Sequence, residues 1–411
     1  MGKRITNILL IFSLGVFLFG CGYKIGEYKT SINKIDIQNY SLLNTQPSLS
    51  SNKTKNLDFS LFWETWDKIE QKFIDKKKIN SQKMFYGAIK GMVASLEDPY
   101  TFFLSPDENK QSKDDLKGRF EGIGAQLGLK DGQIIIIAPL KNSPSQRAGI
   151  KAGDFIVKVN NQSTKGWTLP QAVSKIRGPK GTTVRLTIQR GSLPEFTKDI
   201  VREQINIASV ELSYEKDVAY LKLNQFGENT AAEWDKAVDE IKNKWLEKKI
   251  KGLILDLRDN PGGYLEGSVY LASEFIPEGK LVVRQESTTT ENKDYNSMRT
   301  GNLLDIPMVV LINKGSASAS EILSGALRDY GRATLVGEKT FGKGSVQEAL
   351  ELKDGAGLHI TVAKWILPKG DWINGTGIEP KIKIENQIKD GNTMTRDQDK
   401  QLNSAIEELL K

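Results

Sequence analysis

The sequence predicts a multidomain protein with an α/β core, on the basis of two changes of pattern along the chain. Residues 205–380 alternate short apolar runs with amphipathic helical stretches, which is typical of an α/β layer architecture. Residues 119–202 instead contain short strand-like runs broken by glycine, which indicates a self-contained α+β module. A length of 411 residues is enough for two or three domains with ordinary cores.

The N-terminus predicts export or anchoring. Lys3 and Arg4 precede an uncharged run from Ile5 to Tyr23, close to the ~20 residues that span a bilayer. Because a basic end tends to stay in the cytoplasm, we expect the rest of the chain outside it, in the periplasm or the extracellular space. The segment that ends at Cys21 also resembles a lipoprotein signal, although Phe19 is bulkier than that motif usually has. We favour an uncleaved anchor over a lipidated Cys21.

The next residues predict a tether followed by helices. Residues 24–57 are rich in Ser, Asn, Thr and Lys, with few apolar residues. Residues 58–117 have apolar side chains at helical spacing, which we interpret as core. These are Leu61, Trp63, Trp66, Ile69, Phe73, Met84, Ile89, Met92 and Leu96. The expected divisions of the chain are 1–23 for the anchor, 24–57 for the tether, 58–117 for the N-terminal helical segment, 118–203 for the module, 204–380 for the core and 381–411 for a C-terminal helical segment.

Within the module and the core, the runs can be placed one by one. In the module we expect strands at 123–129, 133–140, 154–160 and 183–190, with helices at 143–149 and 169–178. In the core we expect strands in the runs 218–226, 250–263 (where the strand ends in a turn), 308–315 and 333–340, with helices at 231–245, 265–276 and 319–331. A last helix is expected within 396–411.

Composition excludes several kinds of site. The 58 basic and 51 acidic residues give a net charge of +7 that is spread along the chain, so nucleic acid is not an expected partner. The chain has one cysteine and one histidine, so it cannot build a disulfide framework or a His/Cys metal cluster by itself. We see no spacing of acidic residues that suggests a carboxylate metal site, and we expect no cofactor.

Three serines at alternate positions precede the apolar helical run that ends at Leu327. They are Ser316, Ser318 and Ser320. Ser318 and Glu321 fit a capping box, which is the more frequent role of this pattern. A helix N-terminus that follows a strand also presents N–H groups that stabilise developing negative charge, so a nucleophilic serine fits there too. Position alone does not decide between the two roles.

A nucleophilic serine needs a base. His359, the only histidine, would share the polar face of a strand with Thr361, and we interpret it as a surface residue. The other candidate is Lys343, which lies between Gly342 and Gly344. Glycines let the backbone approach closely, and burial would lower the pKa of the lysine from about 10.4 far enough to leave a neutral amine.

Gln347 follows Lys343 by four residues and could orient the amine through its carbonyl oxygen without adding charge. The alternative is a solvated lysine in a flexible glycine loop.

The stretch Leu255–Gly263, with the sequence LDLRDNPGG, predicts a buried strand that ends in a turn. Glycine N–H groups in such a turn can point into a cleft as an oxyanion hole requires, although a turn with no further role is more frequent.

Taken together, the order and spacing of these motifs resemble the C-terminal processing peptidases, or tail-specific proteases, of the serine–lysine type. Residues 86–106 resemble the family's N-terminal helical segment and residues 119–202 its PDZ domain. LDLRDNPGG, GSASASEI and GEKTFGKGSVQ resemble its protease motifs. The resemblance implies an α/β protease core of the crotonase and Clp protease type, with an inserted α+β PDZ domain and helical segments at both ends.

The resemblance also implies roles for single residues. Ser318 would be the nucleophile, Lys343 the general base and Gln347 the residue that orients it. The N–H group of Ala319 would form the oxyanion hole together with that of Gly262 or Gly263. Asp329 matches a recurrent family position, where a structural role is at least as frequent as a catalytic one.

In the PDZ module, Gly122, Ile123 and Gly124 resemble the loop and strand that receive the C-terminus of a peptide as an added strand. Arg177 matches a position that links peptide binding to an active arrangement, and the alternative for it is an arginine on the surface of the module. The expected function is that of a membrane-anchored extracytoplasmic serine endopeptidase acting on protein C-termini, with self-association as in relatives. The alternatives are a catalytically inactive PDZ scaffold and a histidine-dependent protease.

Overall fold

The computed structural model describes residues 58–411 except 141, 152, 168, 289–290 and 387–395. The predicted anchor and tether lie outside the described residues. No helix in the described part of the chain has both the length and the apolar character needed to cross a membrane.

The core is built on a six-stranded sheet in the order β10-β11-β12-β15-β16-β19. The strands are β10 Val210–Glu215, β11 Val218–Leu223, β12 Gly252–Asp256, β15 Met308–Ile312, β16 Thr334–Gly337 and β19 Ile382–Lys383. β10 and β11 form an antiparallel hairpin, and every later pair along the sheet is parallel. Every residue of β12 and β15 is buried, as expected for parallel strands with helices on both faces.

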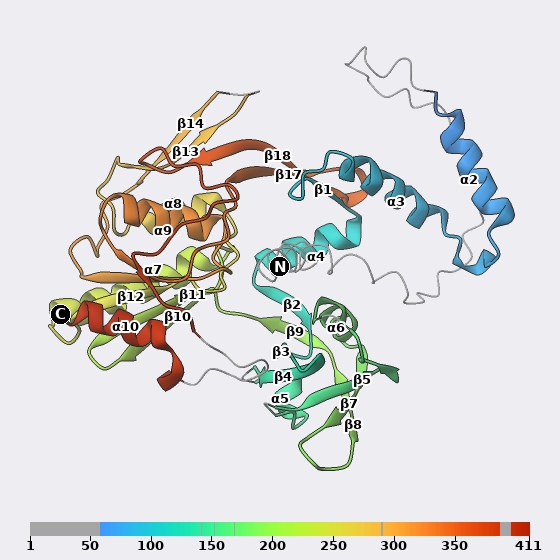
Figure 1. The fold of residues 1–411 in the computed structure, drawn as a ribbon, viewed down its shortest axis with the longest axis horizontal. Coiled ribbons are helices and arrows are strands. Elements are labelled where there is room, and N and C mark those ends of the chain that lie inside the picture. Colours follow the sequence, from blue (N-terminus) through green and yellow to red (C-terminus); the bar gives the residue numbers. More distant parts are fainter. Residues whose placement is uncertain (1–57, 141, 152, 168, 289–290, 387–395) are drawn as a thin grey trace.

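Helices cover both faces of this sheet (Figure 1). On one face α7 Thr230–Leu246, α8 Leu265–Ala272 and α9 Ala319–Asp329 form the large hydrophobic core of the molecule. On the other face lies α10 Lys400–Leu409, which buries Leu402 and Ile406 against the sheet. The alternation of strands and helices predicted for the core is confirmed.

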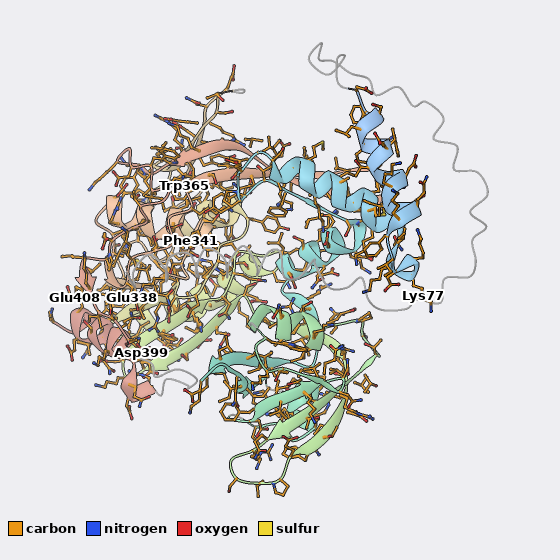
Figure 2. The ribbon with its side chains drawn as sticks, turned by 45° about the vertical axis from the view of Figure 1, so that its right-hand side comes forward. Lys77, Glu338, Phe341, Trp365, Asp399 and Glu408 are labelled. Atoms are coloured by element: carbon orange, nitrogen blue, oxygen red, sulfur yellow. The ribbon has the colours of Figure 1, made fainter. Side chains whose placement is uncertain are left out.

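A buried arginine joins α10 to the end of β12. The Arg258 guanidinium lies 2.6 Å from the Asp256 carboxylate and 2.9 Å from that of Asp399, which precedes α10 (Asp399 is labelled in Figure 2). Because both carboxylates are bound by one guanidinium, the last helix is fixed to the strand that leads into the Asn-Pro-Gly-Gly turn. A short 3-10 helix, η4 Arg396–Gln398, precedes α10.

A second sheet lies above α8 and α9 in Figure 1. It contains β1 Phe102–Leu104, β18 Gly357–Ile366, β13 Leu281–Glu286, β14 Lys293–Asn296 and β17 Ser345–Glu351. β17 and β18 form an antiparallel hairpin around the 3-10 helix η3 Lys353–Gly355. β1 pairs with the other edge of β18 and places Phe102 opposite His359. The N-terminal segment is thus part of the same sheet as β17, which follows Lys343.

The predicted module is a separate α+β unit. Its sheet has the order β3-β4-β5-β7-β8, with β6 beside β5. The elements are β3 Ala125–Lys130, β4 Gln133–Pro139, α5 Pro144–Arg147, β5 Phe155–Val159, β6 Gln162–Ser163, α6 Leu169–Ile176, β7 Thr183–Gln189 and β8 Phe196–Val201. β2 Arg119–Gly122 and β9 Glu203–Asn206 pair as a two-stranded ribbon where the chain enters and leaves the unit. Among the residues that the structure describes, β3 has a sheet neighbour on one side only.

The N-terminal helices form an arm that extends from the molecule (Figure 1). They are α2 Ser60–Lys72, η2 Lys76–Lys78, α3 Ser81–Ala94 and α4 Pro106–Leu116. The predicted helices are confirmed, but the interpretation of their apolar residues as core is wrong. Leu61 is 71% exposed and Met92 66%, because α2 has little to pack against except α3. Helical spacing of apolar residues shows which face is apolar, not whether anything covers it.

Candidate active site

Ser318 lies between β15 and α9 in a strained backbone conformation. Its φ is 54° and its ψ −116°, a combination that costs a residue with a side chain about 1–3 kcal/mol. Ser318 and Glu321 form the predicted capping box, so the structural role of this pair is confirmed. The capping box does not by itself account for the positive φ of Ser318.

The two neighbouring serines are buried and have structural hydrogen bonds. The Ser316 hydroxyl donates to the carbonyl oxygen of Leu257 at 2.8 Å, and the Ser320 hydroxyl donates to that of Asn260 at 3.0 Å. Ser318 is only half-buried. Of the three serines, the middle one is therefore the one whose side chain can meet a substrate.

The Asn-Pro-Gly-Gly turn packs directly against the start of α9. A Cβ atom on Gly262 would lie 2.8 Å from the Cβ of Ser318 and 2.9 Å from the nitrogen of Ala319, so this position requires glycine. The Gly262 N–H donates to the Asn260 side chain at 2.9 Å. In the part of the chain that the structure describes, the N–H groups of Gly263 and Ala319 have no hydrogen-bond acceptor. Of the two glycines left open by the sequence, Gly263 has the N–H that is free to bind an oxyanion.

Lys343 follows a loop that runs close to residues 373–377. A Cβ atom on Gly342 would lie 2.7 Å from the Gly377 nitrogen, and one on Gly344 would lie 2.7 Å from the Asn374 nitrogen. Both flanking glycines are thus needed for a close approach of two backbone segments, as the sequence predicts. Burial lowers the pKa of Lys343 to about 8, although the nearby Glu321 and Asp98 carboxylates favour the charged form. At pH 7 roughly a tenth of the amine is then neutral.

A turn from the N-terminal segment lies over the lysine. The Lys343 Nζ is 5.1 Å from the centroid of the Tyr100 ring. Burial opposes the ionisation of Asp98, but hydrogen bonds from Thr101, Thr361 and the Tyr100 N–H outweigh it and hold the Asp98 pKa below its usual range. No role for this turn is predicted from the sequence. Its only signal was the stretch EDPYT within the family-like N-terminal segment.

The predicted site residues are brought together only in part. The Ser318 hydroxyl and the Lys343 amine share no hydrogen bond in the described structure, but the backbone N–H groups of both residues donate to Glu321. Gln347 lies on β17, where its amide donates to the hydroxyls of Ser345 at 2.8 Å and Thr361 at 3.2 Å. No hydrogen bond between Gln347 and Lys343 is formed among the described residues.

His359 is half-buried rather than a surface residue. Its ring stacks on that of Phe102, with centroids 4.6 Å apart and an angle of 13° between the planes. Burial lowers the pKa of His359, and the positive charge of Lys343 acts in the same direction. The alternation of faces along the strand was correct, but pairing of β1 with β18 covers the ring.

Asp329 has structural partners. Its carboxylate accepts hydrogen bonds from the Arg328 side chain at 2.8 Å and from the Lys369 N–H at 3.0 Å. These bonds connect the end of α9 to the loop after β18, so they support the structural role for this position.

A cleft of about 1110 Å³ opens beside the loop that contains Lys343. One wall is formed by Asp98 and Tyr100, the other by Thr340, Phe341 and Gly342 (Phe341 is labelled in Figure 2). Residues 361–364 of β18 and Trp372 also contribute to its lining.

In the module, the predicted peptide-binding residues lie at the start of the edge strand β3. The Ile123 carbonyl accepts from the Ser145 N–H at 2.8 Å, and the Gly124 carbonyl accepts from the Ser145 hydroxyl at 2.6 Å. Gly124 has φ +68° and its missing side chain makes room for Ser143, so glycine is required there. Gly122 ends β2 just before this loop.

Arg177 connects the module to the N-terminal helices. Its guanidinium lies 3.2 Å from the Asp115 carboxylate at the end of α4 and 4.6 Å from the centroid of the Phe120 ring. The Arg177 side chain is only 19% exposed. Arg177 is therefore not a free arginine on the surface of the module.

Comparison with known proteins agrees with this architecture. The family model of peptidase family S41 matches residues 217–384, that of a PDZ domain matches 135–190, and that of the activating protease CtpB N-terminal domain matches 20–108. The carboxy-terminal processing protease CtpB of Bacillus subtilis is 35% identical over 384 residues, which cover 92% of this chain and 78% of that protein. A probable CtpA-like serine protease of Staphylococcus aureus is 42% identical over 314 residues, which cover 75% of this chain and 62% of that protein.

Solved structures show the same fold. The photosystem II D1 C-terminal processing protease matches with a TM-score of 0.52 at 27% identity, over 85% of this chain and 97% of that one. A putative S41 protease from Bacteroides fragilis has a similar fold, with a TM-score of 0.55 at 17% identity over 84% of this chain and 96% of that one. The chain therefore belongs to the C-terminal processing peptidases of family S41, and it is a serine protease with a PDZ domain.

Proposed function

We propose that this protein is a membrane-anchored extracytoplasmic endopeptidase that binds the C-termini of proteins through its PDZ domain and cleaves them with a Ser318/Lys343 dyad. The observation that supports the dyad most directly is the pKa of Lys343, which burial lowers to about 8, in a residue whose backbone N–H shares the Glu321 carboxylate with that of Ser318. An amine with this pKa can take a proton from a serine hydroxyl near neutral pH.

The reaction would begin at β3. A peptide added to this edge strand would pair with its free backbone groups, with its terminal carboxylate near Gly122, Ile123 and Gly124. The remainder of the substrate would enter the cleft beside Thr340–Gly342. Because Ser318 and Lys343 are not hydrogen-bonded in the described structure, the proposal includes a movement of the lysine side chain toward the serine when a peptide binds.

Cleavage would then follow serine protease chemistry. The Lys343 amine takes the hydroxyl proton while the Ser318 oxygen attacks the peptide carbonyl, and the N–H groups of Ala319 and Gly263 stabilise the oxyanion. The lysine returns the proton to the leaving amine. Water deprotonated by the same amine hydrolyses the acyl-enzyme. Gln347 would orient the amine only if its side chain turns from Ser345 and Thr361, where it is held in the described structure.

Three further parts of the proposal rest on the N-terminal sequence and on the resemblance to the family. The uncharged run Ile5–Tyr23 would anchor the chain, either as an uncleaved segment or through a lipidated Cys21. The α/β core would be related to the crotonase and Clp protease type. The chain would self-associate as a homo-oligomer.

The dyad is tested by incubating the protein with an unfolded protein substrate and analysing the fragments by mass spectrometry. Ser318→Ala and Lys343→Ala should each abolish cleavage, while the exposed control changes Ser163→Ala and Lys381→Ala should leave it intact. His359→Ala should be nearly silent, and loss of activity in that variant would favour the histidine-dependent protease. Absence of cleavage by the unaltered protein, with peptide binding retained, would favour the inactive PDZ scaffold.

A further inference from the structure

One carboxylate joins the two segments that contain the proposed dyad. Glu321 is fully buried at the start of α9, and both of its oxygens accept hydrogen bonds from residues on either side of the site. We infer that Glu321 is a positioning residue, which sets the separation of the Ser318 and Lys343 backbones by accepting an N–H from each on the same oxygen. This inference rests on the proposed dyad and adds a residue to which that proposal gives no part.

Each oxygen of the Glu321 carboxylate accepts two hydrogen bonds. Its Oε2 accepts from the Ser318 N–H at 2.9 Å and from the Lys343 N–H at 3.0 Å. Its Oε1 accepts from the Thr340 hydroxyl and from the Gly342 N–H, both at 2.6 Å. Four donors therefore converge on two oxygens, and three of the four come from the loop 340–343 rather than from α9. A helix cap needs only the bond to Ser318.

The Thr340 hydroxyl can act only as a donor toward Glu321. Its oxygen accepts from the Ile378 N–H at 2.7 Å, so its hydrogen is left to donate to Glu321. The ionised form of Glu321 fits this site, because a proton on either oxygen would face a donor. Burial is the larger effect and raises the pKa of Glu321, although the hydrogen bonds from Thr340, Lys343, Gly342 and Ser318 oppose it.

The chemistry of the site makes glutamine a poor substitute at this position. A glutamine side chain has the same shape, but one of its two polar atoms is an amide nitrogen that donates instead of accepting. Whichever side the nitrogen takes, it meets two donors. At least one backbone N–H is then unpaired in a buried site, and the loop and the helix start move apart. A misplacement of about 1 Å between reacting groups can cost about a hundredfold in rate.

The structure offers a matched control. Glu108 occupies the same position of a second capping box, at the start of α4, where its Oε2 accepts from the Ser105 N–H and hydroxyl, each at 2.8 Å. Glu108→Gln is the same chemical change in the same local pattern, but Glu108 has no contact with the loop 340–343. Glu108→Gln should therefore affect the start of α4 and the ion pair of Glu108 with Lys90, but not the loop 340–343.

The experiment compares kcat and KM for a peptide substrate in Glu321→Gln and Glu108→Gln, at a temperature where circular dichroism shows both variants to be fully folded. For Glu321→Gln we expect kcat to fall by about a hundredfold or more with KM changed less than about threefold, because peptide binding does not use this carboxylate. For Glu108→Gln we expect both constants within about threefold of the unaltered protein. A folded Glu321→Gln variant whose kcat stays within about threefold of that of the unaltered protein would overturn the inference.

A second variant decides the matter if Glu321→Gln does not fold. Thr340→Val removes one donor to Glu321, and with it the acceptor of the Ile378 N–H, but leaves the Ser318 and Lys343 N–H groups in place, and it should lower kcat by about tenfold. An unchanged kcat in Thr340→Val would contradict the inference. Failure of the proposed dyad has a different signature, namely activity that persists in Ser318→Ala or Lys343→Ala.

Discussion

The two capping boxes of this chain have the same local pattern and different surroundings. At α4, Ser105 has an ordinary φ of −61°, and Glu108 binds the N-cap serine and, at 2.5 Å, the Lys90 amine. At α9, Ser318 has φ 54°, and Glu321 binds the N-cap serine and a loop from elsewhere in the chain. The pattern S-x-x-E predicts a helix start in both places, but only the tertiary partners of the glutamate distinguish a cap from part of a site.

The largest expected difference between the two boxes is in pH dependence. The proposed base acts only as the neutral amine, so kcat/KM should rise about tenfold per pH unit below a pKa of about 8 and level off above it. The measurement is a pH profile of kcat/KM between pH 5.5 and pH 9.5. Lys90→Met, which removes the lysine paired with the other box, should leave the profile where it is. A profile that is flat from pH 6 to pH 9 would contradict the assignment of Lys343.

A second difference concerns stability and should have opposite signs at the two boxes. Glycine adopts the φ and ψ of Ser318 without strain, so Ser318→Gly should raise the free energy of unfolding by about 1 kcal/mol while abolishing activity. Ser105→Gly adds backbone freedom at a position with no strain to relieve, and should lower stability by a few tenths of a kcal/mol. Urea denaturation of both variants gives the comparison. A loss of stability in Ser318→Gly would show that its conformation is not strained.

The smallest expected effect tests the turn above Lys343. The Asp98 carboxylate favours the charged amine, so Asp98→Asn should lower the pKa of Lys343 and move the rising limb of the pH profile to lower pH. Asp107→Asn, an exposed change in the first turn of α4, is the control and should not move it. A shift of the limb to higher pH in Asp98→Asn would mean that loss of the turn exposes the lysine to water.

The sequence predicts the elements of this fold well because periodicity is a local property. The strand expected within 308–315 is β15, and the helix expected at 231–245 is α7. Contacts between distant segments are not local, and there the predictions are incomplete. Nothing in the sequence shows that Asp98 and Tyr100 lie over Lys343, or that Glu321 binds it.

Contacts between distant segments also explain why the interpretations of α2, His359 and Gln347 differ from the structure. The apolar face of α2 looks like that of a core helix because its pattern is the same, whereas its exposure depends on which elements reach it. His359 looks like a surface residue because its strand alternates, whereas β1 brings Phe102 over its ring. The predicted contact between Gln347 and Lys343 depended on the course of β17, which directs the amide toward Thr361.

The open edge of β3 limits what the enzyme can select. Backbone hydrogen bonds along an edge strand are the same for every sequence. They therefore contribute affinity for an added strand, but no specificity for its sequence. Discrimination must come from the free carboxylate at the end of the guest and from the alternate side chains that face the module. If a peptide binds β3 as proposed, blocking the terminal carboxylate of a target should weaken binding more than changing a residue in its interior.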